Sequence, residues 1–224
     1  VRQLADRFAQ AGVAIVAYGD DEHLAPFDRV VSDHEAGAAM LVRWLLERGR
    51  ERILMIAPPE KDGEYWLRQR RDGYEKALEA AGLQPLPAVV IPAADPGETE
   101  RESAFDFQSR LATGYLVEHL LHSEPVDAVL CPSDGVTFPV CAACRRLGKE
   151  PQKDVLVVGY DNYYEDSPER RLEPCLPAAT IDKRNDRIGT ELVDLLLERL
   201  ENPSQEPLRR MVKPELVIPQ TRNP

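Results

Sequence analysis

The sequence predicts an α/β fold in which helices cover the faces of parallel β-sheets. Short apolar runs alternate along the chain with longer segments whose apolar residues recur every three or four positions, as on one face of a helix. The apolar runs are continuous rather than alternating, as in residues 53–57 (ILMIA), which is typical of strands buried on both faces. Strands that alternate with helices favour parallel pairing, because each helix provides a crossover connection.

Strands are expected wherever a short apolar run is bounded by polar residues, glycine or proline. The first of them, residues 13–18 (VAIVAY), has the continuous pattern of a strand buried on both faces. Pro58 and Pro59 end the apolar run at 53–57. We place the strands over residues 13–18, 29–31, 53–57, 89–91, 128–131, 155–159, 179–181 and 214–219.

Helices are expected where apolar residues follow the helical period and a glycine comes after the last of them. In residues 35–47, apolar side chains stand at i, i+3, i+4 and i+7, and Gly49 follows. Residues 92–104 are acidic and contain proline and glycine, so we predict a loop there, and Pro203 and Pro207 mark a linker. We place the helices over residues 2–11, 35–47, 66–81, 108–122, 135–147 and 186–200.

The composition is that of an ordinary globular protein with a large acidic excess. The 224 residues are 43% hydrophobic and 30% charged, and the net charge of −11 gives a pI of about 4.9. Such a surface repels phosphate backbones, so we expect that this chain does not bind nucleic acid by itself. No apolar run approaches the about 20 residues of a membrane helix, and the start of the chain lacks the apolar segment of a signal peptide. The four cysteines lack a disulfide spacing, which favours reduced thiols and a cytoplasmic location.

Polar residues follow several predicted strands at the ends where ligands bind in open parallel sheets. Carboxylates accept hydrogen bonds from sugar hydroxyls, and aromatic side chains cover the C–H faces of sugars. Several carboxylates, few cations and neighbouring aromatic residues occur together here, so the sequence indicates a site for a neutral polyol. The clusters are residues 19–21 (GDD), 32–35 (SDHE), 132–134 (PSD) and 160–162 (YDN).

Structural roles compete with ligand binding at these positions. Ser32 and Glu35 have the spacing of a capping box, and Asp134 can equally cap the helix that follows it. Asp161 follows a strand without an obvious helix to cap, which makes a ligand-binding role more favourable there.

The sequence contains no apparent catalytic or metal-binding constellation. Serines lack the G-x-S-x-G motif, and no glycine-rich phosphate loop occurs, so neither an enzyme nor a bound cofactor is expected. Aspartate pairs permit a glycosidase hypothesis, but no feature singles out an acid and a base. Cys141 and Cys144 fall on the apolar stripe of a predicted helix and are interpreted as core residues. We interpret as surface residues the histidines, which show no metal spacing: His23, His34, His119 and His122.

Six motifs in order along the chain resemble the LacI/GalR (lac-repressor-type) family of transcriptional regulators. The most specific is residues 147–161 (LGKEPQKDVLVVGYD), which resembles the family pattern L-G-x-x-x-P-x-D-x-x-V-V-G-Y-D. The others are residues 31–38 (VSDHEAGA), 45–53 (LLERGRERI), 70–74 (RRDGY), 127–134 (DAVLCPSD) and 177–181 (PAATI).

This resemblance implies a periplasmic-binding-protein-like fold of two lobes, each a parallel sheet flanked by helices and joined by three crossings. It also implies that the first lobe is incomplete here and that a helix-turn-helix DNA-binding headpiece precedes it. We place the crossings near residue 50, near residue 178 and near residues 205–212. The lobes are then residues 1–50 with 179–207, and residues 51–178 with 208–224.

The resemblance also implies which residues bind the effector. Arg70 matches the family's effector arginine, and Asp161 matches the acidic ligand of the G-Y-D turn. Ser133 stands where many sugar-responsive members have asparagine, and its hydroxyl offers one donor where an amide offers two. The expected effector-binding residues are Arg70, Asp161, Ser133, Asp134, Phe107, Phe105 and Trp66, with one of the two phenylalanines covering the ligand.

The function that the resemblance implies is that of a ligand sensor for transcription. A small polar effector, a sugar or related polyol, binds between the lobes and alters operator binding through the headpiece of a homodimer. The alternative is a secreted, periplasmic-type sugar-binding protein that serves a transporter, because the same fold supports both. We expect no metal and no membrane partner for either. Trp66 is expected near the cleft and Trp44 away from it.

Overall fold

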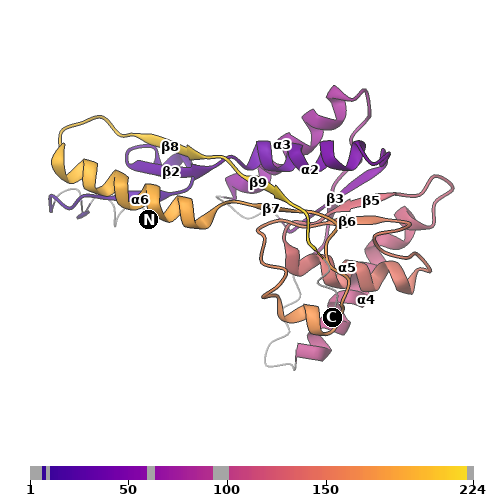
Figure 1. The fold of residues 1–224 in the computed structure, drawn as a ribbon. Coiled ribbons are helices and arrows are strands. Elements are labelled where there is room, and N and C mark those ends of the chain that lie inside the picture. Colours follow the sequence, from indigo (N-terminus) through magenta and orange to yellow (C-terminus); the bar gives the residue numbers. More distant parts are fainter. Residues whose placement is uncertain (1–6, 9–10, 60–63, 93–100, 221–224) are drawn as a thin grey trace.

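The chain forms two bodies, each built around its own parallel sheet (Figure 1). The computed structural model describes residues 7–8, 11–59, 64–92 and 101–220. The strands are β1 (Val16–Tyr18), β2 (Asp28–Ser32), β3 (Ile53–Ala57), β4 (Val89–Val90), β5 (Ala128–Leu130), β6 (Leu156–Val158), β7 (Thr180–Asp182), β8 (Arg209–Val212) and β9 (Glu215–Val217). The α-helices are α2 (His34–Leu46), α3 (Tyr65–Ala80), α4 (Arg101–Leu120), α5 (Asp134–Arg146) and α6 (Asn185–Glu201). Two short 3-10 helices are η1 (Glu22–Leu24) and η2 (Pro168–Arg171).

The larger body is a four-stranded parallel sheet with helices on both faces. Its strand order is β4-β3-β5-β6. Ile53 and Met55 of β3 face α2 and α3, whereas Leu54 and Ile56 face α4 and α5. Both faces of the sheet are therefore buried, which explains why the run at 53–57 has no polar residue. This confirms the predicted covered parallel sheet.

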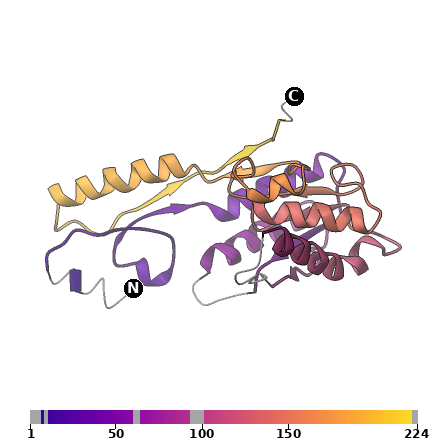
Figure 2. The ribbon, with the colours of Figure 1, turned by 90° about the horizontal axis from the view of Figure 1, so that it is seen from below.

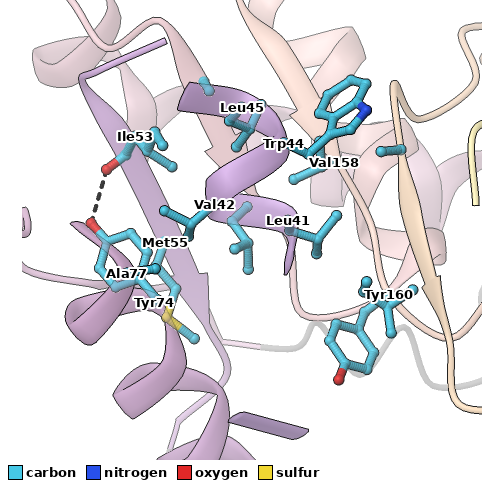
Figure 3. Packing of buried hydrophobic residues seen from close by; sticks show 14 of the residues in the cluster. Leu41, Val42, Trp44, Leu45, Ile53, Met55, Tyr74, Ala77, Val158 and Tyr160 are labelled. Atoms are coloured by element: carbon cyan, nitrogen blue, oxygen red, sulfur yellow. Dashed lines mark hydrogen bonds between the residues drawn. The ribbon is translucent and has the colours of Figure 1, made fainter. Parts of the chain in front are cut away.

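The α2–α3 face carries the larger of the two apolar clusters in this body (Figure 3). Leu41 and Leu45 of α2 lie against Met55 of β3, and all three are buried. The hydroxyl of Tyr74 on α3 donates a hydrogen bond of 2.9 Å to the backbone oxygen of Ile53. This packing fixes α2 and α3 to the sheet and to each other.

The smaller body is a three-stranded parallel sheet, β1-β2-β8, covered by α6. Val30 of β2 and Val212 of β8 pack against Ile188 and Leu195 of α6. Figure 2 shows this body from a second side, with α6 lying along the strands. The strand predicted at 13–18 is shorter and is not buried on both faces, because β1 is an edge strand and Tyr18 is exposed.

Three connections join the bodies, and β7 and β9 form a two-stranded antiparallel pair where they meet. The chain passes from β2 into α2 at Asp33, returns between β7 and α6, and passes back after β8. The predicted first crossing near residue 50 was therefore wrong, because α2 packs on β3 and α3 in the larger body. The third crossing follows Val212, because β8 pairs with β2. The lobe boundaries predicted at residues 50 and 208 are therefore replaced by boundaries at Asp33 and after Val212.

Some predicted elements differ from the structure in other ways. Helix α4 begins at Arg101, so the end of the loop predicted over 92–104 is helical, and residues 93–100 lie outside the described residues. Most of the predicted helix at 2–11 lies outside them as well. The capping box at Ser32 was wrong, because α2 is capped by Asp33, whose carboxylate accepts from the N–H of Ala36 at 2.9 Å.

The predicted core role of the paired cysteines is confirmed, since Cys141 and Cys144 are buried between α5 and the sheet. Within the described part of the chain, every helix is too short or too polar to cross a membrane.

Candidate ligand-binding site

A cavity of about 370 Å³ lies where the two bodies meet, at the carboxyl ends of the strands. The smaller body contributes Tyr18 at the end of β1. The larger body contributes residues within three positions after β3, β5 and β6 and the first turns of α2 and α3. The connection after β7 contributes Lys183. The lining from the larger body comprises His34, Pro58, Tyr65, Trp66, Arg70, Pro132, Ser133, Val136 and Asp161.

Arg70 is a buried side chain in the cavity wall, with 4% of its surface exposed. Its guanidinium lies 3.5 Å from the ring centroid of Tyr160 and 4.7 Å from that of Trp66. Nη1 donates to the backbone oxygen of Pro132 at 2.7 Å, and Nη2 donates to Oδ1 of Asp161 at 3.4 Å. Aromatic stacking and these hydrogen bonds fix the plane of the guanidinium, which is the arrangement that presents a rigid fork of donors.

Asp161 lies at the centre of the charged part of the site. Its Oδ1 accepts from Arg70 and lies 3.0 Å from Nζ of Lys183. Its backbone has φ of 89°, in the left-handed region, and its N–H donates to the backbone oxygen of Ile181 at 2.8 Å. This conformation turns the chain sharply after β6 and brings the carboxylate toward both cations.

His34 is buried beside Arg70 and is neutral at physiological pH. Nε of Arg70 lies 3.4 Å from Nδ1 of His34, and an arginine can only donate, so Nδ1 accepts and the proton resides on Nε2. Burial, together with the positive charges of Arg70 and Lys183, lowers the pKa of His34 to about 3. The interpretation of His34 as a surface residue was therefore wrong.

Tyr65 connects the larger body to the smaller one at the cavity mouth. Its hydroxyl lies beside Gly19, where a Cβ would come within 3.2 Å of the oxygen. Burial raises the pKa of Tyr65, and a backbone hydrogen bond from Asp20 acts in the opposite direction. Tyr18 lies in the same wall and shares a 3.0 Å hydrogen bond with Ser32. Tyr65, Tyr18 and Trp66 thus form the aromatic part of the lining.

The structure brings four of the predicted site residues together at the cavity: Arg70, Asp161, Ser133 and Trp66. Ser133 occupies the N-cap position of α5 but makes no capping hydrogen bond. Trp44, by contrast, is packed in the core of the larger body, with Arg48 stacked 3.7 Å from its ring centroid. The placement of both tryptophans agrees with the expectation.

Asp134 was expected at the site but is fully buried and does not line the cavity. Its carboxylate accepts from the hydroxyl of Thr180 at 2.6 Å and from the N–H groups of Tyr163 and Tyr164 at 2.8 and 3.1 Å. It neither caps α5 nor faces a ligand, but holds the loop after β6 against α5 and β7. A Cβ at Gly159 would lie 2.1 Å from this carboxylate, so the glycine of the G-Y-D turn is needed for space.

Phe105 and Phe107, expected to cover the ligand, lie on α4 and are not among the residues that line the cavity. Phe107 is 51% exposed. Their predicted role depended on a loop that is in fact the first turns of a helix. Two residues that line the cavity, His34 and Lys183, were absent from the predicted set. Position supplies a signal for both, since each follows a strand directly or within two residues.

Replacing His34 with glutamine is expected to weaken the pH dependence of stability. The folded-state pKa lies below the ordinary value of 6.5, so the unfolded chain takes up a proton first as the pH falls. The contribution of neutral His34 to the free energy of unfolding is complete above about pH 6.5. Below that pH the free energy of unfolding falls, by at most about 1.4 kcal/mol per pH unit. Urea denaturation at pH 7 and pH 5 measures this effect, because the amide oxygen of glutamine still accepts from Arg70 but does not titrate.

The comparison between parent and variant isolates His34 from Asp134, whose effect has the opposite sign. Burial raises the pKa of Asp134 to about 6, so its ionisation destabilises the fold as the pH rises toward that value. This contribution is present in both proteins and cancels in the difference. The exposed His23 lies outside the cavity, and His23→Gln provides the matched control for replacing a histidine with glutamine. Equal slopes in the parent and His34→Gln would contradict the assigned protonation of His34.

The sequence matches the family of periplasmic binding protein-like domains over residues 42–221, most of the chain. The chain belongs to this family. The HTH-type transcriptional regulator CelR of Thermobifida fusca is 28% identical over 212 residues, which cover 93% of this chain and 56% of CelR. The chain spans about half the length of the curated relatives it matches, which are transcriptional regulators. The resemblance to lac-repressor-type regulators is thereby confirmed.

Solved structures show the same fold. The complex of the transcriptional regulator CelR with cellobiose has a TM-score of 0.72 at 24% identity, covering 96% of this chain and 61% of that chain. A LacI family transcriptional regulator from Enterococcus faecium with bound ribose has a TM-score of 0.68 at 20% identity, covering 96% of this chain and 72% of that chain. The periplasmic-binding-protein-like fold is confirmed by this agreement. No group of three or more metal-ligating side chains comes together among the residues that the structure describes.

Proposed function

We propose that this chain is the ligand-sensing domain of a lac-repressor-type transcriptional regulator. A small polar effector, a sugar or related polyol, binds in the cavity beside Arg70 and Asp161. The observation that carries the proposal is that polar and aromatic side chains of both bodies surround one cavity, at the strand ends where such sheets bind ligands. The relatives support the regulatory role, because those reported above are transcriptional regulators.

The lining suits a polyol. Arg70, Asp161 and Ser133 offer hydrogen-bonding groups of both kinds, and Trp66 and Tyr65 offer flat faces for C–H groups. Two of the similar structures hold cellobiose and ribose, which is consistent with a sugar-sized ligand here. The cavity of about 370 Å³ lies within the range of small-molecule sites.

The mechanism that follows is a shift between arrangements of the two bodies. Tyr18 belongs to the smaller body, Arg70 to the larger one, and Lys183 to a connection between them. A ligand that contacts all three stabilises the arrangement in which they surround it, and the equilibrium moves toward that arrangement by the difference in affinity.

Regulation also requires a dimer and a DNA-binding segment, and both belong to this proposal. The exposed face of α6 carries Val193, Leu197 and Leu200, which supports an interface between two copies of the chain. A two-fold dimer matches a palindromic operator. The net charge of −11 is unsuited to DNA, so the contact is made by a helix-turn-helix headpiece outside this chain, in the cytoplasm.

An operator-binding experiment tests the regulatory proposal. The full-length protein that contains this chain is titrated against a palindromic operator selected from random DNA, with and without the ligand that stabilises the chain. We expect the ligand to change DNA affinity by about fivefold or more, which corresponds to about 1 kcal/mol of coupling. Unchanged affinity, with the ligand bound, would exclude the regulatory role.

A secreted solute-binding protein is the alternative with the same fold. The residues encoded before Val1 separate the two. A helix-turn-helix there supports the regulator, and a hydrophobic leader followed by a cleavage site supports the transport protein.

A further inference from the structure

The cavity carries more positive charge than a neutral sugar requires. Two cations, Arg70 and Lys183, line it, and Asp161 is the only acid among the described residues of its wall. The chain as a whole has the opposite balance, with 39 acidic residues against 28 basic ones. A local excess of positive charge within an acidic protein is a specific feature of this site, and it concerns the effector that the proposed function requires.

The nearby acids do not neutralise this excess, because other groups hold them. Asp182 accepts from the side-chain amide of Asn162 at 2.9 Å and from the N–H of Arg184 at 2.6 Å. Asp20, at the mouth of the cavity, is held by two arginines of the smaller body, which lower the pKa of its carboxyl. Asp161 alone is shared between Arg70 and Lys183.

Lys183 is the cation with unused hydrogen-bonding capacity. Nζ has three N–H donors and lies 3.0 Å from Oδ1 of Asp161 in an ion pair. The side chain retains 20% exposure, whereas Arg70 is almost completely buried and already donates to Pro132, His34 and Asp161. A ligand in the cavity can therefore contact Lys183 without displacing an existing protein hydrogen bond.

The rest of the lining adds an N–H donor and hydroxyl groups that can both donate and accept. His34 has its one free N–H on Nε2, because Nδ1 is occupied by Arg70. Ser133 and Tyr65 contribute hydroxyl groups. The main strong acceptor is the second carboxylate oxygen of Asp161. A ligand rich in acceptors, and above all an anion, satisfies this arrangement better than a neutral polyol, which brings one donor with every hydroxyl.

From this arrangement we propose that the effector carries an anionic group, a carboxylate or a phosphate, and that Lys183 is the residue that selects for it. The anion lies beside Nζ of Lys183 and next to the guanidinium of Arg70, and the polyol part extends along Trp66 and Tyr65. Arg70, Lys183 and Asp161 together carry a net charge of +1, and a bound carboxylate brings the net charge of the occupied site to 0. The inference rests on the proposed function, since it specifies the ligand of that same site.

Thermal denaturation at constant ionic strength tests this inference, with D-glucose, D-glucuronate, D-glucose 6-phosphate and inorganic phosphate as probes. We expect at least one anionic probe to raise the Tm of the parent more than glucose does. In Lys183→Gln, apparent affinity for that probe should fall about tenfold, while any affinity for glucose is retained. Lys153→Gln, at an exposed lysine before β6, is the matched control and should behave as the parent. Glucuronate and the two phosphate probes distinguish the carboxylate from the phosphate source.

Three outcomes contradict the inference in different ways. If glucose stabilises the parent as strongly as the anions and Lys183→Gln responds equally, the preference for an anion is wrong but the ligand-sensing proposal stands. If anionic probes stabilise the parent, Lys183→Gln and Lys153→Gln alike, the effect is a general one of salt and Lys183 has no selective role. If neither these probes nor a wider panel of neutral sugars stabilises the parent, the inference and the proposed function fail together.

Discussion

Replacing Arg70 with alanine is expected to abolish the response of the chain to its effector. The guanidinium is buried, in cation–π contact with two aromatic rings and directed by hydrogen bonds to Pro132 and Asp161. Loss of a buried, charge-assisted donor costs about 2–5 kcal/mol of binding energy, which is roughly 30-fold or more in Kd. The variant also leaves Lys183 as the sole cation beside Asp161, so the remaining charges of the site no longer favour an anion.

Calorimetric titration of the strongest ligand from a sugar, sugar-acid and sugar-phosphate panel measures this effect. Arg68→Ala is the matched control, because Arg68 is exposed on the same helix two residues earlier. Arg70→Lys retains the charge without the planar fork and should bind with intermediate affinity. An Arg70→Ala chain that binds as tightly as Arg68→Ala would show that the ligand lies elsewhere.

Substituting alanine for Gly73 is expected to destabilise the larger body strongly. A Cβ at this position would lie 2.1 Å from the backbone oxygen of Glu35, so α2 and α3 must separate to accommodate it. Overpacking against backbone costs about 1–3 kcal/mol even after relaxation, which exceeds the about 1 kcal/mol that alanine gains over glycine in a helix. The same movement separates His34 from Arg70, so ligand affinity should fall as well.

A glycine in an open environment provides the control for this substitution. Gly114 lies within α4, and no atom would come within 4 Å of an added Cβ there. Gly114→Ala is therefore expected to stabilise the chain by roughly 0.5–1 kcal/mol, while Gly73→Ala destabilises it. Chemical denaturation of both variants measures the two opposite signs. A Gly73→Ala chain as stable as the parent would contradict the close approach of α2 to α3.

The close approaches of the helices explain motif residues that the sequence could only match by resemblance. Gly73 is the glycine of the R-x-x-G segment, and it sets the distance between the helices that carry His34 and Arg70. Gly37 belongs to the D-x-x-x-G segment, and a Cβ there would lie 2.3 Å from the hydroxyl of Tyr160, the tyrosine of the G-Y-D turn. The motifs therefore contact one another in space, which is information that no single segment contains.

Hydrophobic patterning predicted the elements of the larger body well, because both faces of its sheet are covered and its strands are continuous apolar runs. The same criterion failed for β8. Its two arginines, Arg209 and Arg210, form ion pairs with Asp20, Glu191 and Glu198, so an edge strand of the smaller body has a polar sequence. The apolar stripe of α2 predicted a helix on a sheet, but a stripe does not specify which sheet, and the first crossing was misplaced for that reason.

The site was predictable to the extent that strand ends determine it. The rule that ligands lie beyond the carboxyl ends of strands placed Asp161 and Ser133 correctly at the cavity. Lys183 follows β7 in the same manner but was overlooked, because that strand was not included among the ends considered. His34 also follows a strand end, but its burial could not be predicted, since it depends on Tyr65 and Tyr160, which are distant in sequence. Asp134 was assigned a ligand role because the sequence does not show that its carboxylate accepts a hydrogen bond from the distant Thr180.

A crystal structure of the chain with the panel ligand that stabilises it most tests the central claim directly. The account predicts density for that ligand between the two bodies, within hydrogen-bond distance of Arg70 and Asp161 and in contact with Trp66. Density at another place, such as the apolar hollow lined by Ile91, Leu111 and Val140, would contradict the assignment of the site.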